Sequence, residues 1–258
     1  MKDSARTVRG YELYGSIAVV ESGPREAKSA AKRLMLSNKN IKTVLRKGGA
    51  VSGKYRTRKL VYVAGAKNYL AEYRENGCVF RFDMRKVFFS TKLAYERKRI
   101  SELAKDGEHV IVMFAGVGPY SIEIAKPHRK SKVVSIELNP QASRYARENA
   151  LLNKTPNVVV EQGNVEKFTG KYSRFADRIV MPLPMDSFMF LPAALKMCAK
   201  LCTIHYYTFC KEKEVGATIA KLKRFLKSKG RRLRLIGWRA VRPYSATDIE
   251  IAVDFVVD

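Results

Sequence analysis

Residues 110–126 read VIVMFAGVGPYSIEIAK, and residues 131–140, after a short break, read SKVVSIELNP. In the first stretch Gly116 and Gly118 lie between two apolar runs, where they let the backbone bend tightly after a buried strand and approach a ligand closely. Glu137 ends the next strand, about 20 residues further on, where a carboxylate can accept hydrogen bonds from ribose hydroxyls. The two stretches together predict a strand-turn-helix-strand unit that holds a nucleotide-like cofactor.

Two proline-containing patterns narrow the class of cofactor. Asn139-Pro140 follows the acid directly, and Pro182-Leu183-Pro184 follows a later apolar strand. A G-x-G turn alone does not separate nucleotide cofactors, but these additions favour S-adenosylmethionine over a dinucleotide. Asn139 is placed to cap a helix and Pro140 to occupy its first turn, where a missing N–H costs nothing.

From about residue 107 onward, apolar strands alternate with helices, which is typical of a parallel sheet with helices on both faces. The predicted fold class is α/β, a class I (Rossmann-like) methyltransferase fold of about seven strands whose last two form an antiparallel pair. Helices are expected at Pro140–Asn153 and at Glu212–Ser228, the second ending at Gly230. The expected strands are His109–Phe114, Lys132–Leu138, Val158–Gln162, Ala176–Met181, Cys202–Phe209, Arg232–Val241 and Ile249–Val257.

Residues 1–83 differ from the rest of the chain in their pattern of apolar runs and turns, and this pattern predicts a smaller α/β domain. Strands are expected in YELYGSIAVVE and KLVYVAG, around an amphipathic helix at Pro24–Leu36, and Asn76-Gly77 is a strong signal for a hairpin turn. The predicted organisation is the small domain at 1–83, a linker with a leading helix at 84–106, and an S-adenosylmethionine-binding domain at 107–258.

The chain carries 50 Lys and Arg residues against 24 Asp and Glu residues, a net charge of +26. Heat-adapted proteins also accumulate lysine and arginine, but usually with matching glutamate for ion pairs. The excess therefore indicates a polyanionic partner, and nucleic acid best fits a chain with no apolar run long enough to span a membrane. The N-terminus lacks the apolar stretch of a secretion signal, so we expect a cytoplasmic protein.

The four cysteines, at positions 78, 198, 202 and 210, form no C-x-x-C pair. Cys198 and Cys202 are one helical turn apart, but no second pair of ligands lies at a useful spacing for a metal ion. We therefore expect buried apolar side chains here and predict no metal site.

The carboxyl ends of the first three predicted strands of the large domain supply a cofactor pocket. Phe114 ends the first of these strands, at the edge of the sheet where ligands lie in open α/β folds. Glu137 is expected to bind the ribose, and Leu138 to lie against the adenine face. Asn164, after the third strand, is placed either to hydrogen-bond the adenine edge or to serve only as a turn residue.

The segment MPLP at 181–184 ends the fourth strand of the large domain. Enzymes that methylate exocyclic amino groups commonly place Asn/Asp-Pro-Pro-aromatic here. This chain has Met185 instead of the aromatic residue and Pro182 instead of the amide, which disfavours an exocyclic amine as the target. Pro182 and Pro184 form either a rigid wall beside the target base or an ordinary turn.

Glu96 lies on the helix that precedes the first strand of the large domain. From spacing alone, Glu96 is expected to be a surface residue paired with Lys98 or Arg99, and composition does not assign it a catalytic role.

Five segments, FFSTKLAYERKRI, VMFAGVGPYSIEIAK, SIELNP, ADRIVMPLP and IHYY, resemble in order and spacing the archaeal tRNA (guanine-N1)-methyltransferases that act at position 37, beside the anticodon. The resemblance covers roughly residues 45–258. The small domain resembles that family's second domain. The further N-terminal domain of many members, which contacts the outer corner of tRNA, is expected to be missing.

The resemblance implies roles for individual residues. Glu96 matches the general base that takes the proton from guanine N1, and Arg56 the arginine that stabilises negative charge on O6. Two departures stand out, because Asn164 and Val112 occupy positions where the family usually has aspartate. The residues matched to the methyl-donor site are Phe88, Arg97, Phe114, Gly116, Gly118, Glu137, Leu138, Asn164 and Val165.

Pro182 is the most informative departure, because the common form of the family has Asn-Leu-Pro there. The Pro-Leu-Pro form resembles an archaeal subgroup that acts twice in wyosine synthesis. It methylates N1 of guanosine, and later C7 of 4-demethylwyosine (imG-14), giving isowyosine. Proline lacks the amide that would clasp guanine, so Pro182 is expected to leave a roomier pocket. The resemblance implies tRNA, held at its anticodon loop, as the partner of a monomer.

Two alternatives stay open. One is an aminocarboxypropyltransferase of wyosine synthesis, which shares a Glu-x-Asn-Pro signature like Glu137–Pro140; the FAGVGP turn with Glu96 and Pro-Leu-Pro favours methyl transfer. The other is a non-catalytic RNA-binding protein on a methyltransferase fold, a reading that the residues Val112 and Asn164 support.

Overall fold

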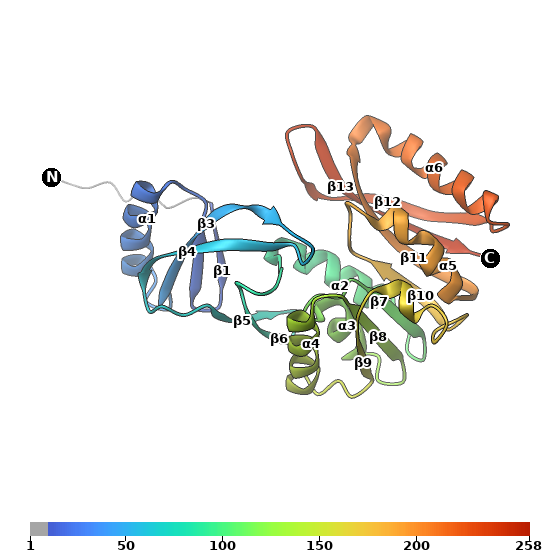
Figure 1. Ribbon diagram of the computed structural model, residues 1–258, viewed down its shortest axis with the longest axis horizontal. Helices are drawn as coiled ribbons and strands as arrows, with labels where there is room; N and C mark the ends of the chain where they lie inside the picture. The colour runs from blue at the N-terminus through green and yellow to red at the C-terminus, as the bar shows by residue number, and fades with distance from the viewer. Residues whose placement is uncertain (1–9) are drawn as a thin grey trace. The chain divides into compact units, whose positions relative to one another are not determined.

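The computed structural model describes residues 10–258, apart from the side chains at positions 51 and 52. Within it the chain forms two compact units, one ending at Ala94 and one spanning Tyr95–Asp258 (Figure 1). The segment 84–106, expected as a linker and leading helix, is divided between them. None of the described helices is both long and apolar enough to cross a membrane.

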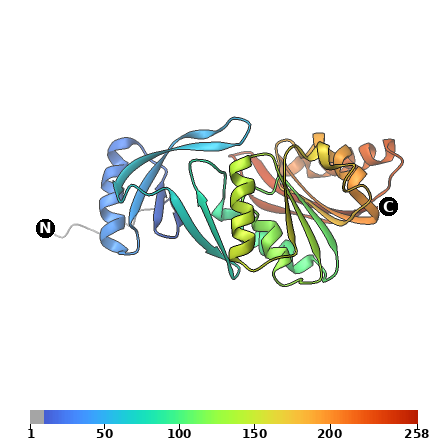
Figure 2. The ribbon, with the colours of Figure 1, turned by 60° about the horizontal axis from the view of Figure 1, so that its bottom comes forward.

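The first unit contains a four-stranded sheet in the order β1-β2-β3-β4, covered by one helix (Figure 2). The helix α1 buries Ala27, Ala31 and Leu34 against this sheet. The strand β3 has no counterpart among the predicted strands, because its glycines and charges interrupt the apolar alternation that signals a strand. The elements are β1 (Tyr11–Tyr14), β2 (Ile17–Val20), α1 (Pro24–Ser37), β3 (Thr43–Ser52) and β4 (Thr57–Gly65).

A separate two-stranded hairpin, β5 (Leu70–Glu75) and β6 (Cys78–Asp83), completes the first unit. Asn76 and Gly77 form its turn with φ angles of 46° and 73°. Both angles lie in the left-handed region that a two-residue hairpin turn requires, which confirms the prediction from the Asn-Gly pair.

The second unit is built on a seven-stranded sheet in the order β12-β13-β11-β10-β7-β8-β9 (Figure 1). The five neighbouring strands β9, β8, β7, β10 and β11 run parallel to one another. β13 pairs antiparallel with β11, and β12 pairs antiparallel with β13. This arrangement confirms the predicted α/β class and the closing antiparallel pair. The strands are β7 (His109–Met113), β8 (Lys132–Glu137), β9 (Val158–Gln162), β10 (Ala176–Met181), β11 (Cys198–Lys211), β12 (Leu233–Pro243) and β13 (Asp248–Val257).

The sheet is buried on both faces, as the alternation along β7 shows. Ile111 and Met113 belong to one apolar cluster, together with residues of the last two helices, while Val110 and Val112 belong to a second cluster. Successive side chains of a strand point to opposite faces, so helices must cover both. The helices are α2 (Ala94–Leu103), α3 (Pro119–Ala125), α4 (Pro140–Leu152), α5 (Leu191–Met197) and α6 (Val215–Ser228), with short 3-10 turns η2 (Val165–Phe168), η3 (Ser187–Phe190) and η4 (Glu212–Glu214). A further 3-10 turn, η1 (Thr91–Leu93), lies at the end of the first unit.

Several predicted strand ends need correction; β12 runs to Pro243 rather than to Val241, and β13 begins at Asp248 rather than at Ile249. β7 ends one residue early, because Phe114 has a φ of 56° and so leaves the extended conformation. β8 likewise ends at Glu137, before Leu138. β11 begins earlier than expected, at Cys198, because α5 runs directly into it and its pairing with β10 contains a register shift that absorbs the extra residues. All four cysteines are buried and free, as predicted.

Candidate active site

The turn after β7 is shaped by residues with positive φ. Gly116 and Gly118 have φ angles of 58° and 86°. A Cβ atom at Gly118 would meet Ile122 Cδ1 at 3.2 Å and Ala146 Cβ at 3.4 Å, so glycine also lets α3 and α4 approach each other here. The backbone therefore bends tightly at the carboxyl end of β7, as the sequence predicts.

Glu137 is held between two loops. Its Oε2 accepts a hydrogen bond from the Gly116 N–H at 2.8 Å, and its Oε1 accepts one from the Asn139 N–H at 2.7 Å. Burial raises the pKa of this carboxyl group, and the backbone N–H donors oppose the rise. Asn139 Oδ1 accepts from the Gln141 N–H at 3.0 Å, which confirms the predicted helix cap.

The loop after β9 joins the same edge of the sheet, because the Gly163 N–H donates to the Glu137 carbonyl oxygen at 2.8 Å. Asn164 Oδ1 accepts from the Glu166 N–H at 3.1 Å, and Val165 is buried behind it. The turn role of Asn164 is thus present. A role at an adenine edge stays a prediction.

These loops fit a nucleoside such as the adenosine part of S-adenosylmethionine. A carboxylate has about four acceptor positions, and the backbone N–H groups of Gly116, Leu138 and Asn139 do not fill all of them, so the Glu137 carboxylate can accept a further bond from a ribose hydroxyl. Leu138 is half-buried beside it, and the Phe114 ring packs on Phe190 with centroids 4.9 Å apart. Arg97 is buried 3.6 Å from the Glu123 carboxylate, and Val112 is fully buried.

Glu96 is not a surface residue, which corrects the expectation from spacing. Its side chain is only 3% exposed. The reason is that Glu96 and Ile100 lie one turn apart on the same face of α2, and Ile100 is fully buried in the core. Of the two partners considered, the structure selects Arg99, while Lys98 lies 3.7 Å from Glu102.

Three short hydrogen bonds fix the Glu96 carboxylate. Tyr207 Oη and Arg99 Nη2 both donate to Oε1 at 2.6 Å, and Arg99 Nε donates to Oε2 at 2.9 Å. Arg239 Nε lies 3.8 Å from Oε2. The carboxylate therefore has one fully engaged oxygen, Oε1, and one oxygen, Oε2, that retains acceptor capacity.

Pro182 lies close in the sheet to the partner of Glu96. Met181, the last residue of β10, pairs with Tyr206 on β11, so Pro182 follows directly after the end of β10 while Tyr207 continues β11 beside it. The turn after Met181 is closed by Ser187, whose hydroxyl donates to the Met181 carbonyl at 3.0 Å and to the Leu183 carbonyl at 2.9 Å. The Pro-Leu-Pro segment is therefore anchored at its base.

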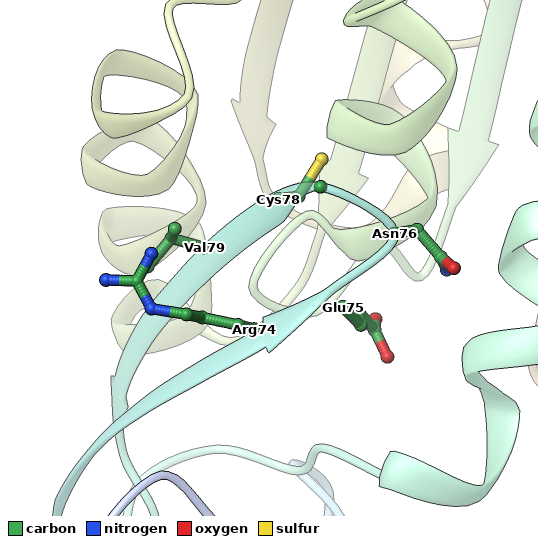
Figure 3. A pocket seen from close by; sticks show the side chains of 6 residues that line it. Arg74, Glu75, Asn76, Cys78 and Val79 are labelled. Carbon is green, nitrogen blue, oxygen red and sulfur yellow. The ribbon is translucent and has the colours of Figure 1, made fainter.

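Arg56 and Phe88 belong to the first unit, whereas Glu96 and the remaining predicted site residues belong to the second. Arg56 lies in the turn between β3 and β4 with a φ of 52°, and Phe88 is 41% exposed. A hollow of about 350 Å³ at the hairpin tip of the first unit contains none of the predicted site residues; Figure 3 shows Arg74 and Asn76 extending to opposite sides of it.

Sequence reasoning missed the residues around Glu96. Tyr207 and His205 lie in the quoted IHYY segment but received no role. Arg178 and Asp254 are charged residues at buried positions of the strands ADRIVM and DIEIAVDFVV. A charge in a buried strand is the one signal that could have identified them, because buried charges need partners.

Comparison with known proteins places these observations in a family. Residues 71–234 match the TRM5/TYW2 methyltransferase domain. The tRNA (guanine(37)-N(1))-methyltransferase Trm5b of Pyrococcus abyssi is 37% identical over 252 residues, covering 96% of this chain and 74% of that protein. The tRNA 4-demethylwyosine(37)-methyltransferase Taw21 of Saccharolobus solfataricus is 34% identical, covering 81% and 80%. The tRNA (guanine(37)-N(1))/4-demethylwyosine(37)-methyltransferase Taw22 of Nanoarchaeum equitans is 29% identical, covering 82% and 88%.

Solved structures agree with the sequence relatives. The crystal structure of Pyrococcus abyssi Trm5b superposes with a TM-score of 0.86 at 35% identity, covering 97% of this chain and 75% of that one. A complex of aTrm5 with tRNALeu gives 0.83 at 26% identity, covering 97% and 72%. Pyrococcus horikoshii TYW2 in complex with MeSAdo gives 0.84 at 26% identity, covering 96% and 90%.

Proposed function

This chain belongs to the TRM5/TYW2 methyltransferase family, and on that premise we propose that it uses S-adenosylmethionine to methylate N1 of guanosine at position 37 of tRNA. The observation that carries the proposal is the buried Glu96 carboxylate. Arg99 and Tyr207 hold this carboxylate by hydrogen bonds. Tyr207 lies on β11, beside the end of β10 from which the Pro-Leu-Pro turn leaves. The same unit carries the loops around Gly116 and Glu137 that fit the methyl donor.

Glu96 acts as the general base. Guanine N1 carries a proton at neutral pH, so a nearby group must accept it before or during methyl transfer. Oε2 is the oxygen that takes this proton, because Oε1 already accepts two hydrogen bonds. We assign Arg56 the stabilisation of the negative charge on O6, a role that suits the positive guanidinium group of an arginine.

The remaining work of the site is alignment. When bound, S-adenosylmethionine supplies a methyl group on a sulfonium that leaves as a neutral thioether while the N1–carbon bond forms. Glu137, Leu138 and Phe114 hold the adenosine side of the pocket, and the anchored Pro182 turn forms its wall on the base side. Base N1 is hidden in stacked RNA, so the target nucleotide flips into the pocket.

We also propose a second activity, methylation of C7 of 4-demethylwyosine. The relatives Taw21 and Taw22, whose names state this activity or both activities, support it. Pro182 supports it physically, since a proline presents no side-chain amide to clasp guanine and leaves room for a larger tricyclic base.

Binding of tRNA rests on charge. The net charge of +26 suits a phosphate backbone, and the similar protein aTrm5 has a solved structure in complex with tRNALeu. The exposed face of α6 carries Lys221, Lys223, Arg224 and Lys227 around a buried apolar stripe. Such residues hold phosphates without reading sequence.

One experiment tests both activities. The protein is incubated with labelled donor and two tRNAs, one with unmodified guanosine 37 and one with 4-demethylwyosine, and the products are identified by mass. We expect a methyl group on each. Transfer of an aminocarboxypropyl group would support the rival enzyme, and tRNA binding without any transfer would support a non-catalytic protein.

Two variants sharpen this experiment. Glu96→Gln keeps the shape of the side chain but cannot take a proton, so we expect N1 methylation to fall by about 100-fold or more while tRNA binding is unchanged. Pro182→Asn restores an amide and should slow action on 4-demethylwyosine more than on guanosine. Equal effects on the two substrates would refute the pocket argument, with Pro184→Asn as the matched control.

A further inference from the structure

Glu96 is the last member of a buried hydrogen-bonded network of charged and polar side chains that crosses three strands of the second unit. On one side of Arg99 lies Glu96; on the other, Arg99 Nη1 donates to Asp254 Oδ2 at 2.5 Å. The members, in order, are Glu108, Arg178, His205, Asp254, Arg99 and Glu96, from the loop before β7 through β10, β11 and β13 to α2.

The end of this network that is distant from Glu96, at Glu108 and Arg178, is also fixed by hydrogen bonds. Arg178 donates through Nε and Nη2 to the two oxygens of Glu108 at 2.7 and 2.9 Å, and through Nη2 to the Leu103 carbonyl at 2.7 Å. Its Nη1 lies 2.6 Å from His205 Nε2. Every contact of this guanidinium is therefore short.

These contacts determine the tautomer of His205. A guanidinium can only donate, so Nε2 must accept from Arg178. The ring proton is therefore on Nδ1, which donates to Asp254 Oδ1 at 2.7 Å. Protonation of Nε2 would set two donors against each other, and burial also lowers the pKa of His205. His205 is thus a neutral donor held in one orientation.

The arrangement is built into the sheet register. His205 and Asp254 are directly paired residues of the antiparallel strands β11 and β13. Tyr207, two residues beyond His205 on β11, points to the same face and donates to Glu96. Neighbouring strands therefore orient the Glu96 carboxylate by two routes, through Tyr207 directly and through Asp254 and Arg99.

We propose that Asp254 and His205 are positioning residues of the methyltransferase: they hold Arg99, which in turn orients Glu96 and shares its positive charge between two carboxylates. This proposal rests on the proposed role of Glu96 as the base. Without Asp254, the whole charge of Arg99 would face Glu96, making the carboxylate a poorer proton acceptor, and the Arg99 fork would lose the contact that stops it from turning.

The test is Asp254→Asn, with Asp177→Asn as a matched control at a half-exposed site on β10. Single-turnover methylation of guanosine-37 tRNA is measured against pH with saturating donor. We expect a loss of about tenfold or more in the plateau rate for Asp254→Asn. We also expect the acidic limb of the profile to move to lower pH, because Arg99 is left uncompensated beside Glu96. Donor and tRNA affinities should not change.

The pH profile has a limited number of other sources. The titratable and charged groups around Glu96 on the elements packed against α2 are Tyr120 of α3, Tyr207 of β11, Arg239 of β12, and Glu250 and Asp254 of β13, together with Arg97 and Arg99 of α2 itself. Only Asp254 changes in the test. An Asp254→Asn enzyme with the parental rate and profile would overturn the proposal.

If Asp254→Asn does not fold, two substitutions at His205 give the same answer. His205→Asn keeps an amide donor for Asp254, whereas His205→Leu removes it. We expect His205→Leu to be at least about fivefold slower than His205→Asn at equal donor affinity, and equal rates would refute the proposal. Glu96→Gln distinguishes a failure of the general-base proposal from a failure of the positioning proposal. A fully active Glu96→Gln enzyme would refute the role of Glu96 as general base, independently of the result for Asp254→Asn.

Discussion

At Gly118, backbone conformation and packing demand the same residue. Its φ of 86° lies in the left-handed region, and α3 and α4 leave only 3.2 Å and 3.4 Å for a Cβ atom. The sequence indicated the first requirement through its G-x-G pattern. The second comes from Ala146, which is distant along the chain, so only the folded structure reveals it.

Gly118→Ala should therefore be destabilised by both effects. Backbone strain at such a φ costs about 1–3 kcal/mol, and the crowded Cβ adds to it. The matched control is Gly107→Ala, where φ is 91° but no atom lies within 4 Å of the added Cβ. Urea unfolding should show a larger loss for Gly118→Ala. Equal losses would mean that contact with Ile122 and Ala146 is immaterial.

At the scale of elements, the pairing of β11 with β13 decides where the charges lie. The apolar periods of both strands are visible in the sequence, but the contact between His205 and Asp254 depends on register. The two carboxylates that share Arg99 likewise come from different elements, α2 and β13. Polar residues in buried strands are therefore interpretable only once their cross-strand neighbours are known.

This strand pair should make stability depend on acid pH. Burial opposes ionisation of Asp254, but the bonds from His205 and Arg99 prevail and lower its pKa from the ordinary 3.8 to about 2. The folded value is below the unfolded one, so the stabilisation is complete above pH 3.8 and is lost as pH falls towards 2. The lost contribution is about 2 kcal/mol.

His205 acts in the same direction at higher pH. Burial lowers the pKa of His205, so its contribution to the free energy of unfolding is complete above pH 6.5, the ordinary pKa of histidine, and declines as pH falls below that value. Unfolding by urea between pH 7 and pH 3 should therefore show a loss of stability that Asp254→Asn reduces at its acid end. The same acid slope in Asp254→Asn and in the parent would contradict this assignment.

At the scale of the whole molecule, the excess of positive charge is the dominant property. It predicts tRNA binding that falls steeply with salt, because each neutralised phosphate releases counterions. Net charge alone does not tell which surface meets the RNA. The proposal that α6 contributes requires a comparison in which total charge is kept constant.

The double variant Lys223→Glu/Lys227→Glu on α6 makes this comparison with Lys28→Glu/Lys32→Glu on α1. All four lysines are exposed, and both variants lower the net charge equally. We expect the α6 variant to bind tRNA about tenfold more weakly at low salt, with a shallower salt dependence. Equal weakening by both pairs would show that only net charge matters.

The sequence by itself determined the α/β class, the alternation of strands and helices along the second unit, the glycine turn, the Glu137 acid and the capped helix after it, because each depends on neighbours within a few residues. It also indicated the family through segments quoted in order. The spatial order of the strands in the sheet came only from the tertiary structure. Tertiary structure alone decided that Glu96 is buried, that Arg99 and Tyr207 are its hydrogen-bond partners, and that Asp254 and His205 are linked to it through Arg99. The physical reason is that a buried charge is stabilised by groups far along the chain, and strand register brings them within hydrogen-bond distance.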